Sequence, residues 1–168
     1  MSAMRRDARG FTWIELLLVL AVFAVLAAMA IPGFRDAALK KQVAEGMALA
    51  GIAKQGVQAA WTAKGEMPAD NAGAALPPRD KIVGNLVKDV NVAEGAITLT
   101  FGNNAASALQ GKRVTIRPAI VADQPVVPIA WLCHAVPVPK GMEVRGKDET
   151  DIPPAFLPVE CRGKGEGK

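Results

Sequence analysis

The chain has 168 residues, 20 Lys+Arg against 16 Asp+Glu, two cysteines and one histidine. This length suits one small domain beside a long helix and leaves no room for several domains. The sequence holds no glycine-rich phosphate loop, no G-x-S-x-G motif and no clustered carboxylate motif, so it predicts neither an enzyme nor a cofactor.

The first predicted element is an apolar helix over residues 11–34. Only one charged residue, Glu15, and one proline, Pro32, interrupt this stretch. At about 1.5 Å per residue, a helix of this length reaches about 36 Å, which is enough to cross a bilayer. A carboxylate inside such a segment costs on the order of a few kcal/mol, so we expect Glu15 to have a partner or a function.

The ten residues before this helix are short and polar, with three arginines and one aspartate. A secretory signal peptide would carry its cleavage site after the apolar core, and no A-x-A-like site follows this one. The alternative is cleavage before the core, between Gly10 and Phe11, which keeps the apolar helix in the mature protein. A plain signal anchor is the competing interpretation of the same segment.

The junction RG-FTWIEL resembles the prepilin signature of type IV pilins and their relatives. The resemblance implies that residues 1–10 are a leader, and that a membrane-embedded prepilin peptidase cuts after Gly10 and methylates the amino group of Phe11. It makes Glu15 the glutamate that the family retains, whereas Trp13 departs from the usual leucine. It also implies a precursor in the inner membrane and then an extracellular helical homopolymer, built by the pilus assembly machinery.

A register-setting role for Glu15 follows from the cost of buried charges. After cleavage, Phe11 carries an α-ammonium in apolar surroundings, where an ammonium that faces a carboxylate is tolerated and two isolated charges are not. In a staggered helical bundle, the ammonium of an incoming subunit can meet Glu15 of a subunit already in place. The leader holds three of the 20 basic and one of the 16 acidic residues, so 17 and 15 remain and the high pI is weak evidence for nucleic-acid binding.

Residues 35–63 form the second half of the predicted helix. Apolar residues recur there at three- and four-residue steps, which is the helical period: Leu39, Val43, Met47, Ala50, Ala53, Val57 and Trp61. We expect this stripe to pack on a sheet. Gly46, Gly51 and Gly56 lower intrinsic helicity by up to about 1 kcal/mol each and permit close approach of another backbone. Pro32 is expected to kink the helix or to melt one turn around residues 30–33.

Breaker residues predict a loop over residues 64–86, and a sheet follows over residues 87–135. Its four predicted strands are residues 87–92, 96–101, 113–120 and 127–135. Glu94-Gly95 predicts a tight turn between the first two strands. Apolar residues alternate with Thr98 and Thr100, as in a strand with one face open to water. The sequence therefore predicts an α+β fold, a long N-terminal helix on a four-stranded antiparallel sheet, which is the αβ-roll that the pilin resemblance also implies.

Cys133 and Cys161 lie beyond the apolar segment, and an even cysteine count on the exported side points to a disulfide. The sequences WLCHA and FLPVECR resemble the two ends of the disulfide-bounded C-terminal region of type IVa pilins, here residues 133–161. Closing this loop is worth about 3.5 kcal/mol on the chain-entropy estimate.

No metal site is predicted in this region. Two cysteines and one histidine lack the spacing of a structural zinc site, so we interpret His134 as a strand histidine without chemistry. Four acidic residues of the C-terminal loop lack EF-hand spacing and are expected to form a solvated loop: Glu143, Asp148, Glu149 and Asp151.

The sequence thus predicts a structural protein, a type IVa pilin subunit, with residues 35–168 as the periplasmic or extracellular globular domain. Adhesion to a host surface, twitching motility and DNA uptake are what the resemblance implies. A minor pilin at the filament tip shares every motif, and a secretion-system pseudopilin commonly lacks the two cysteines. A DNA-receptor pilin needs a basic stripe, for which the candidates are Arg113, Arg117, Lys140, Arg145, Lys147 and Arg162.

Overall fold

The computed structural model describes residues 11–163, apart from the side chains of residues 30–34. These residues divide into two compact units, with the boundary between Asp36 and Ala37. Gly10, after which cleavage is predicted, lies outside the described residues, and so does the side chain of Pro32.

Helix α1 (Trp13–Ala48) begins two residues after Phe11. Its helical backbone is unbroken over residues 30–33, so the expected melted turn is wrong, while a kink there stays a prediction. Among the residues that the structure describes, none of the helices combines the length and the apolarity that crossing a membrane requires. The predicted membrane segment, residues 11–34, includes the side chains of residues 30–34, which lie outside the description.

Helix α2 (Ala50–Lys64) follows α1 after a single residue, Leu49. Leu49 keeps helical dihedral angles, φ −64° and ψ −24°, but its N–H donates to the carbonyl of Gly46, three residues back, at 3.1 Å. This is the tighter hydrogen-bond step of a 3₁₀ turn. The helix ends at Gly65, whose left-handed φ of 67° lets its N–H donate to the carbonyl of Trp61 at 2.8 Å.

The predicted apolar stripe lies in the core of the second unit. Val43, Ala50, Ala53 and Val57 are fully buried, Trp61 is nearly so, and Leu39 and Met47 pack against the same core. Two of the three glycines permit the expected close approach. A Cβ added at Gly46 would lie 2.5 Å from Cε1 of Phe101, and one added at Gly56 would lie 2.5 Å from the carbonyl oxygen of Ala74. Gly51 is different, because no atom lies within 4 Å of an added Cβ.

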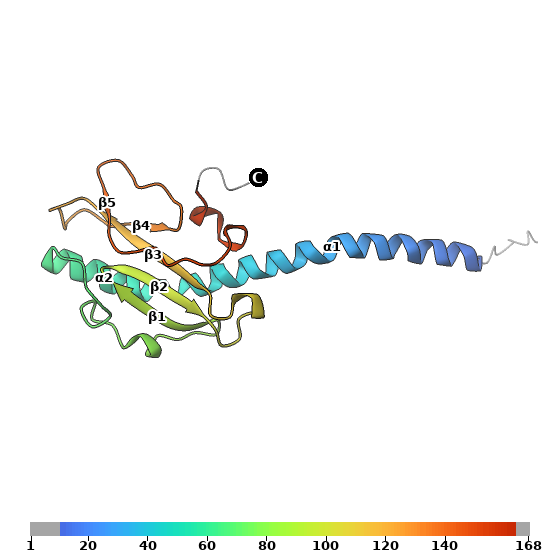
Figure 1. Cartoon of the computed structure of the whole chain (residues 1–168), viewed down its shortest axis with the longest axis horizontal. Helices are drawn as coiled ribbons and strands as arrows, with labels where there is room; N and C mark the ends of the chain where they lie inside the picture. The colour runs from blue at the N-terminus through green and yellow to red at the C-terminus, as the bar shows by residue number, and fades with distance from the viewer. Residues whose placement is uncertain (1–10, 164–168) are drawn as a thin grey trace, which may run out of the picture. The chain divides into compact units, whose positions relative to one another are not determined.

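The sheet is antiparallel, and its first four strands are neighbours in chain order (Figure 1): β1 (Val87–Ala93), β2 (Ala96–Phe101), β3 (Arg113–Ile120) and β4 (Ala130–Cys133). Strands β2 and β3 have the predicted bounds. The turn residues Glu94 and Gly95 have φ values of 50° and 77°, as a two-residue hairpin turn of type I′ requires. Strand β4 is shorter than predicted, because Pro128 lacks an N–H and the φ of 48° at His134 leaves the extended region.

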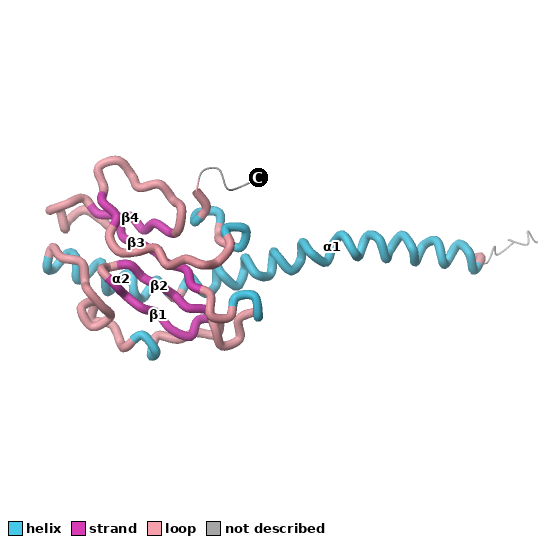
Figure 2. Tube along the Cα trace, viewed as in Figure 1, coloured by secondary structure: helices cyan, strands magenta, loops and turns pink. Residues whose placement is uncertain are grey.

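The structure adds one short strand that the sequence did not predict. Strand β5 (Glu143–Val144) pairs with the end of β3, beyond the residues that pair with β2. Figure 2 shows that the chain after β4 is otherwise mostly loop. Single-turn 3₁₀ helices complete the second unit: η1 (Arg79–Lys81), η2 (Ser107–Leu109), η3 (Pro154–Phe156) and η4 (Val159–Cys161).

The prediction that one face of the sheet is open to water is wrong. Thr98, Thr100 and Thr115 were expected on that face, and each is at most 7% exposed. The hydroxyls of Thr98 and Thr115 are hydrogen-bonded to each other at 3.0 Å, and the N–H of Glu149 donates to Thr115 Oγ1 at 3.1 Å. The polar face is buried because the C-terminal loop covers part of it and supplies hydrogen-bond partners for its hydroxyls.

Asn71 fastens the loop before the sheet to strand β1. Its Nδ2 donates to the carbonyls of Pro77 and Val90, at 3.1 and 3.0 Å, and its Oδ1 accepts the N–H of Val92 at 2.7 Å. The side chain therefore takes the place of a neighbouring strand along the outer edge of β1. The sequence analysis gave this asparagine no role.

We expect Asn71→Ala to lower the free energy of unfolding by about 1–3 kcal/mol, because the buried N–H of Val92 loses its acceptor. Chemical denaturation of the full chain in detergent measures this change. Asn104→Ala is the matched control, since Asn104 is exposed and bonds only to neighbouring loop groups. Equal stability of the two variants would contradict the assigned role.

Candidate assembly site

The first turn of α1 is capped by Thr12. Its Oγ1 accepts the N–H of Glu15 at 3.3 Å, and its carbonyl accepts the N–H of Leu16 at 3.1 Å. A threonine three residues before a glutamate is the sequence pattern of a capping box, so this cap was open to prediction from the T-x-x-E spacing. The carboxylate of Glu15 consequently lies in the first helical turn, where the helix dipole favours a negative charge.

The residues that follow expose apolar side chains around the whole helix. Between Phe11 and Met29, twelve large apolar side chains are each 43% to 76% exposed in the single chain. A helix that is apolar on every side is stable in water only when other apolar groups cover it. The first unit is therefore an element that needs partners.

The second unit carries the predicted disulfide, which is confirmed. Cys133 at the end of β4 is bonded to Cys161 in η4, with their Cα atoms 4.9 Å apart. Both cysteines are buried. The guanidinium of Arg162 donates to the carbonyl of Leu157 at 2.8 and 2.9 Å and to that of Ala155 at 3.1 Å. The chain on both sides of η4 is thus held to the domain.

Residues 145–151 of the C-terminal loop pass from one edge of β3 to the other. The N–H of Arg145 donates to the carbonyl of Pro118 at 2.9 Å, next to the pairing with β5. Further along, the N–H of Asp151 donates to the carbonyl of Arg113 at 3.1 Å, and the Thr115 N–H donates to Thr150 Oγ1 at 3.0 Å. The loop therefore spans β3 and hydrogen-bonds to both of its edges.

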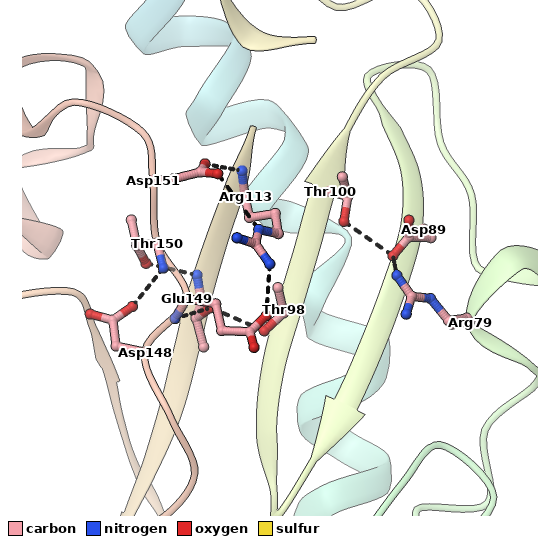
Figure 3. Close-up of polar contacts among 10 residues, drawn as sticks. Arg79, Asp89, Thr98, Thr100, Arg113, Asp148, Glu149, Thr150 and Asp151 are labelled. Carbon is pink, nitrogen blue, oxygen red and sulfur yellow. Dashed lines mark hydrogen bonds and ion pairs between the residues drawn. The ribbon is translucent and has the colours of Figure 1, made fainter. Parts of the chain in front are cut away.

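Charged groups join the C-terminal loop to the start of β3, at Arg113 (Figure 3). Arg113 lies between two carboxylates, with Nη1 3.1 Å from Glu149 Oε2 and Nε 3.6 Å from Asp151 Oδ2. Figure 3 also shows Asp89 of β1, whose Oδ1 accepts from Arg79 at 2.9 Å and from Thr100 at 3.2 Å. The ion pairs of Arg113 are partly exposed, so they position the C-terminal loop more than they stabilise the fold.

His134 and Asp148 form a third contact between the loop and the sheet. His134 follows β4 in a turn and is not the strand residue that was predicted; its Nδ1 lies 3.3 Å from Asp148 Oδ2. Burial alone would raise the pKa of Asp148. The hydroxyl and N–H of Thr150, with the charges of Arg117 and His134, more than offset this effect and hold the pKa below its ordinary value.

A carboxyl whose pKa is lower in the folded state contributes stability above its unfolded pKa and loses it as the pH falls through the folded pKa. We therefore expect Asp148→Asn to flatten the decline in stability between about pH 5 and pH 2. Thermal unfolding midpoints across this range measure the effect. Asp80→Asn, at an exposed position, is the control; a wild-type slope in Asp148→Asn would contradict the prediction.

Comparison with known proteins identifies the family. The model described as "Pilin (bacterial filament)" matches residues 40–162, and the model of the prokaryotic N-terminal methylation motif matches residues 5–31. "Type IV major pilin protein PilE1" of Neisseria gonorrhoeae is 35% identical over 162 residues, which cover 92% of this chain and 87% of the relative. The chain belongs to the type IV pilin family.

Two further relatives of this pilin are similar over different shares of its length. "Type IV major fimbrial protein FimA" of Dichelobacter nodosus is 31% identical over 92% of this chain and 96% of the relative. "Fimbrial protein EcpC" of Eikenella corrodens is 37% identical over 65% of this chain and 73% of the relative. Family membership confirms the predicted function, a structural subunit of an extracellular pilus filament and not an enzyme.

Most of this pilin's candidate DNA-contact residues form ion pairs or hydrogen bonds within the subunit. Arg113 pairs with Glu149, Arg145 with Glu143 at 2.9 Å, and Arg162 with loop carbonyls. Arg117 donates to the carbonyl of His134 at 3.2 Å. Lys140 and Lys147 are the two exposed candidates left. Four of the six residues therefore have partners within the subunit, and DNA contact by any of the six stays a prediction.

The four acidic residues of the C-terminal loop are likewise engaged within the subunit. Glu143 pairs with Arg145, and Glu149 pairs with Arg113. Asp151 Oδ1 accepts the backbone N–H of Arg113 at 2.6 Å. Asp148 is bonded to Thr150 and His134, so all four carboxylates have partners within the subunit. Three of the four residues are exposed, as expected for a solvated loop.

Proposed function

We propose that this chain is the major subunit of its pilus, made as a precursor that is cut after Gly10 and methylated on the amino group of Phe11. The match of the methylation motif to residues 5–31 supports the processing step. The printed names of two relatives that the chain matches over 92% of its length, both major subunits, support the main structural role. The partners that this proposal requires are other copies of the chain, a prepilin peptidase and the pilus assembly machinery.

The exposed apolar helix is the observation that carries the proposal. Eleven large apolar side chains on one helix, and Phe11 just before it, cannot remain in contact with water in a mature extracellular protein. Copies of the same helix can cover one another in a filament core. Before assembly, the apolar run of residues 11–34 holds the precursor in the inner membrane.

Glu15 fixes the register of this assembly. Thr12 caps the first turn, and the carboxylate lies one turn after the new amino terminus. The ammonium at Phe11 of one subunit can pair with the carboxylate of Glu15 on another subunit. This ion pair forms at only one relative position of the two helices, and a shifted helix leaves both charges unpaired.

The intact mass of the subunit in sheared surface filaments tests the proposal. The expected mass starts at Phe11, with one added methyl group and two hydrogens fewer than the reduced chain. Filaments made of another protein would instead assign this chain a minor role. An unprocessed chain recovered from the membrane would overturn the proposal.

Glu15→Gln separates processing from assembly. We expect a normally cleaved subunit and an amount of filament at least about 30-fold lower, because truncating one partner of a buried charge pair costs about 2–5 kcal/mol. Glu66→Gln, at an exposed position of the second unit, is the matched control. Wild-type amounts of filament from Glu15→Gln would show that this carboxylate does not set the register.

A further inference from the structure

An apolar groove follows the outer side of the second unit's helices. It consists of two hollows, of about 300 and 580 Å³, and Ile52 lines both. Ile52 is 54% exposed. Val83, which precedes Gly84 of the first hollow in the sequence, is 52% exposed. Among the described residues, the only ionisable side chain that lines the first hollow is Glu45, and the only one that lines the second is Lys64. We call these two hollows together the helix groove.

Gly51 precedes Ile52 in the chain and has no packing reason within the subunit. Added Cβ atoms at Gly46 and Gly56 would press on Phe101 and on the Ala74 backbone, whereas one at Gly51 would meet nothing within 4 Å. A mid-helix glycine without a packing role is unfavourable relative to alanine. Space therefore remains open beside the exposed Ile52, on a face that water solvates poorly.

We propose that the helix groove receives the apolar N-terminal helix of a second copy of this chain, residues 13–29. The inference rests on the proposed function, since the filament is what brings copies together. The groove begins at Glu45 and Ala48 on α1 itself, so it continues the known assembly helix into α2.

Length and polarity both match this occupant. From Glu45 to Lys64 the groove follows the helices for about 28 Å, and residues 13–29 form a helix of about 25 Å. The groove has its ionisable groups only at its two ends, and residues 16–29 carry no ionisable side chain. A charged segment would leave its ionised groups without opposite charges along the groove, whereas an apolar helix requires none.

Photo-cross-linking in assembled filaments tests the occupant. A photoreactive phenylalanine analogue replaces Ile52, and another replaces Val126, which is 81% exposed in the β3–β4 connection. We expect covalent dimers from position 52, with the cross-linked peptide within residues 11–34 of the second copy. Position 126 should give no cross-link to that peptide. Cross-links from position 52 only to the globular unit of a second copy, or no dimer at all, would overturn the proposal.

A matched pair of polar substitutions tests whether the groove matters for assembly. Ile52→Gln and Val126→Gln make the same kind of change at two exposed positions. We expect Ile52→Gln to lower the filament amount at least five-fold, with the subunit's unfolding temperature unchanged, and Val126→Gln to leave both unchanged. Equal filament amounts from the two variants would overturn the inference. The proposed function would still stand, provided that the wild-type chain forms filaments. Absence of filaments from the wild-type chain would instead reject the proposed function.

Discussion

Cys133→Ala combined with Cys161→Ala is expected to lower the free energy of unfolding by about 3.5 kcal/mol. The bond closes a loop with a sequence separation of 28 residues, and without it the unfolded chain regains the corresponding entropy. The loop has few elements of its own, only β5, η3 and η4, so it depends on this closure. Denaturant unfolding of the purified full chain in detergent gives the difference.

Reduction provides the control for this experiment. Dithiothreitol should bring the wild-type chain down to the stability of the double variant and leave the variant unchanged. The contacts of the loop with Arg113 and His134 remain in both cases, so the expected loss is partial and the sheet survives. A difference below about 1 kcal/mol would show that these polar contacts, and not the disulfide, hold the loop.

Two glycine substitutions should change stability in opposite directions. Gly46→Ala is expected to destabilise the subunit by about 1–3 kcal/mol, because its methyl group would press on Phe101 at 2.5 Å in a packed core. Gly51→Ala is expected to stabilise it by up to about 1 kcal/mol, because the methyl group meets nothing and alanine favours the helix.

Each substitution is the control for the other, since both positions are helical glycines in the same segment of the chain. Thermal unfolding of both full-length variants in the same detergent measures the two shifts relative to the wild type. Two shifts of the same sign would contradict the assigned packing, because helix propensity alone raises the stability of both variants.

The parts of the fold that depend on local chemistry were predictable from the sequence. The helical period placed Val43, Val57 and Trp61 in the core, and the structure buries all three. The bounds of β2 and β3 follow from alternation and from the turn at Glu94-Gly95. The junction RG-FTWIEL was enough to indicate the family, because it resembles the prepilin signature, and the methylation-motif model matches residues 5–31.

Features that depend on contacts between distant segments were not predictable. The alternation of Thr98 and Thr100 with apolar residues is typical of a wet face, and nothing local shows that residues 145–151 cover part of it. The two residues of β5 are too few to show a period. The 3₁₀ hydrogen bond at Leu49 could not be predicted either, since leucine is a good helix former.

Of the candidate site residues, the two cysteines are bonded to each other as predicted. Glu15 lies in the first turn of α1, and its role in assembly stays a prediction, as do the DNA contacts. The arginines chosen as possible DNA contacts face carboxylates or carbonyls that follow or precede them by up to 38 residues in the chain. Charge alone cannot distinguish a free arginine from a paired one, because pairing depends on how the loop crosses β3.

The position of the disulfide near the end of the chain has a consequence for the timing of export. Cys133 closes β4, and Cys161 lies in the last turn that the structure describes, so every strand precedes the second cysteine. If the globular unit is exported behind the apolar helix, its thiols cannot be joined until residue 161 has crossed the membrane. The bond therefore forms only after all the described strands of the globular unit have been exported, so an oxidised subunit is one whose whole sheet is already outside.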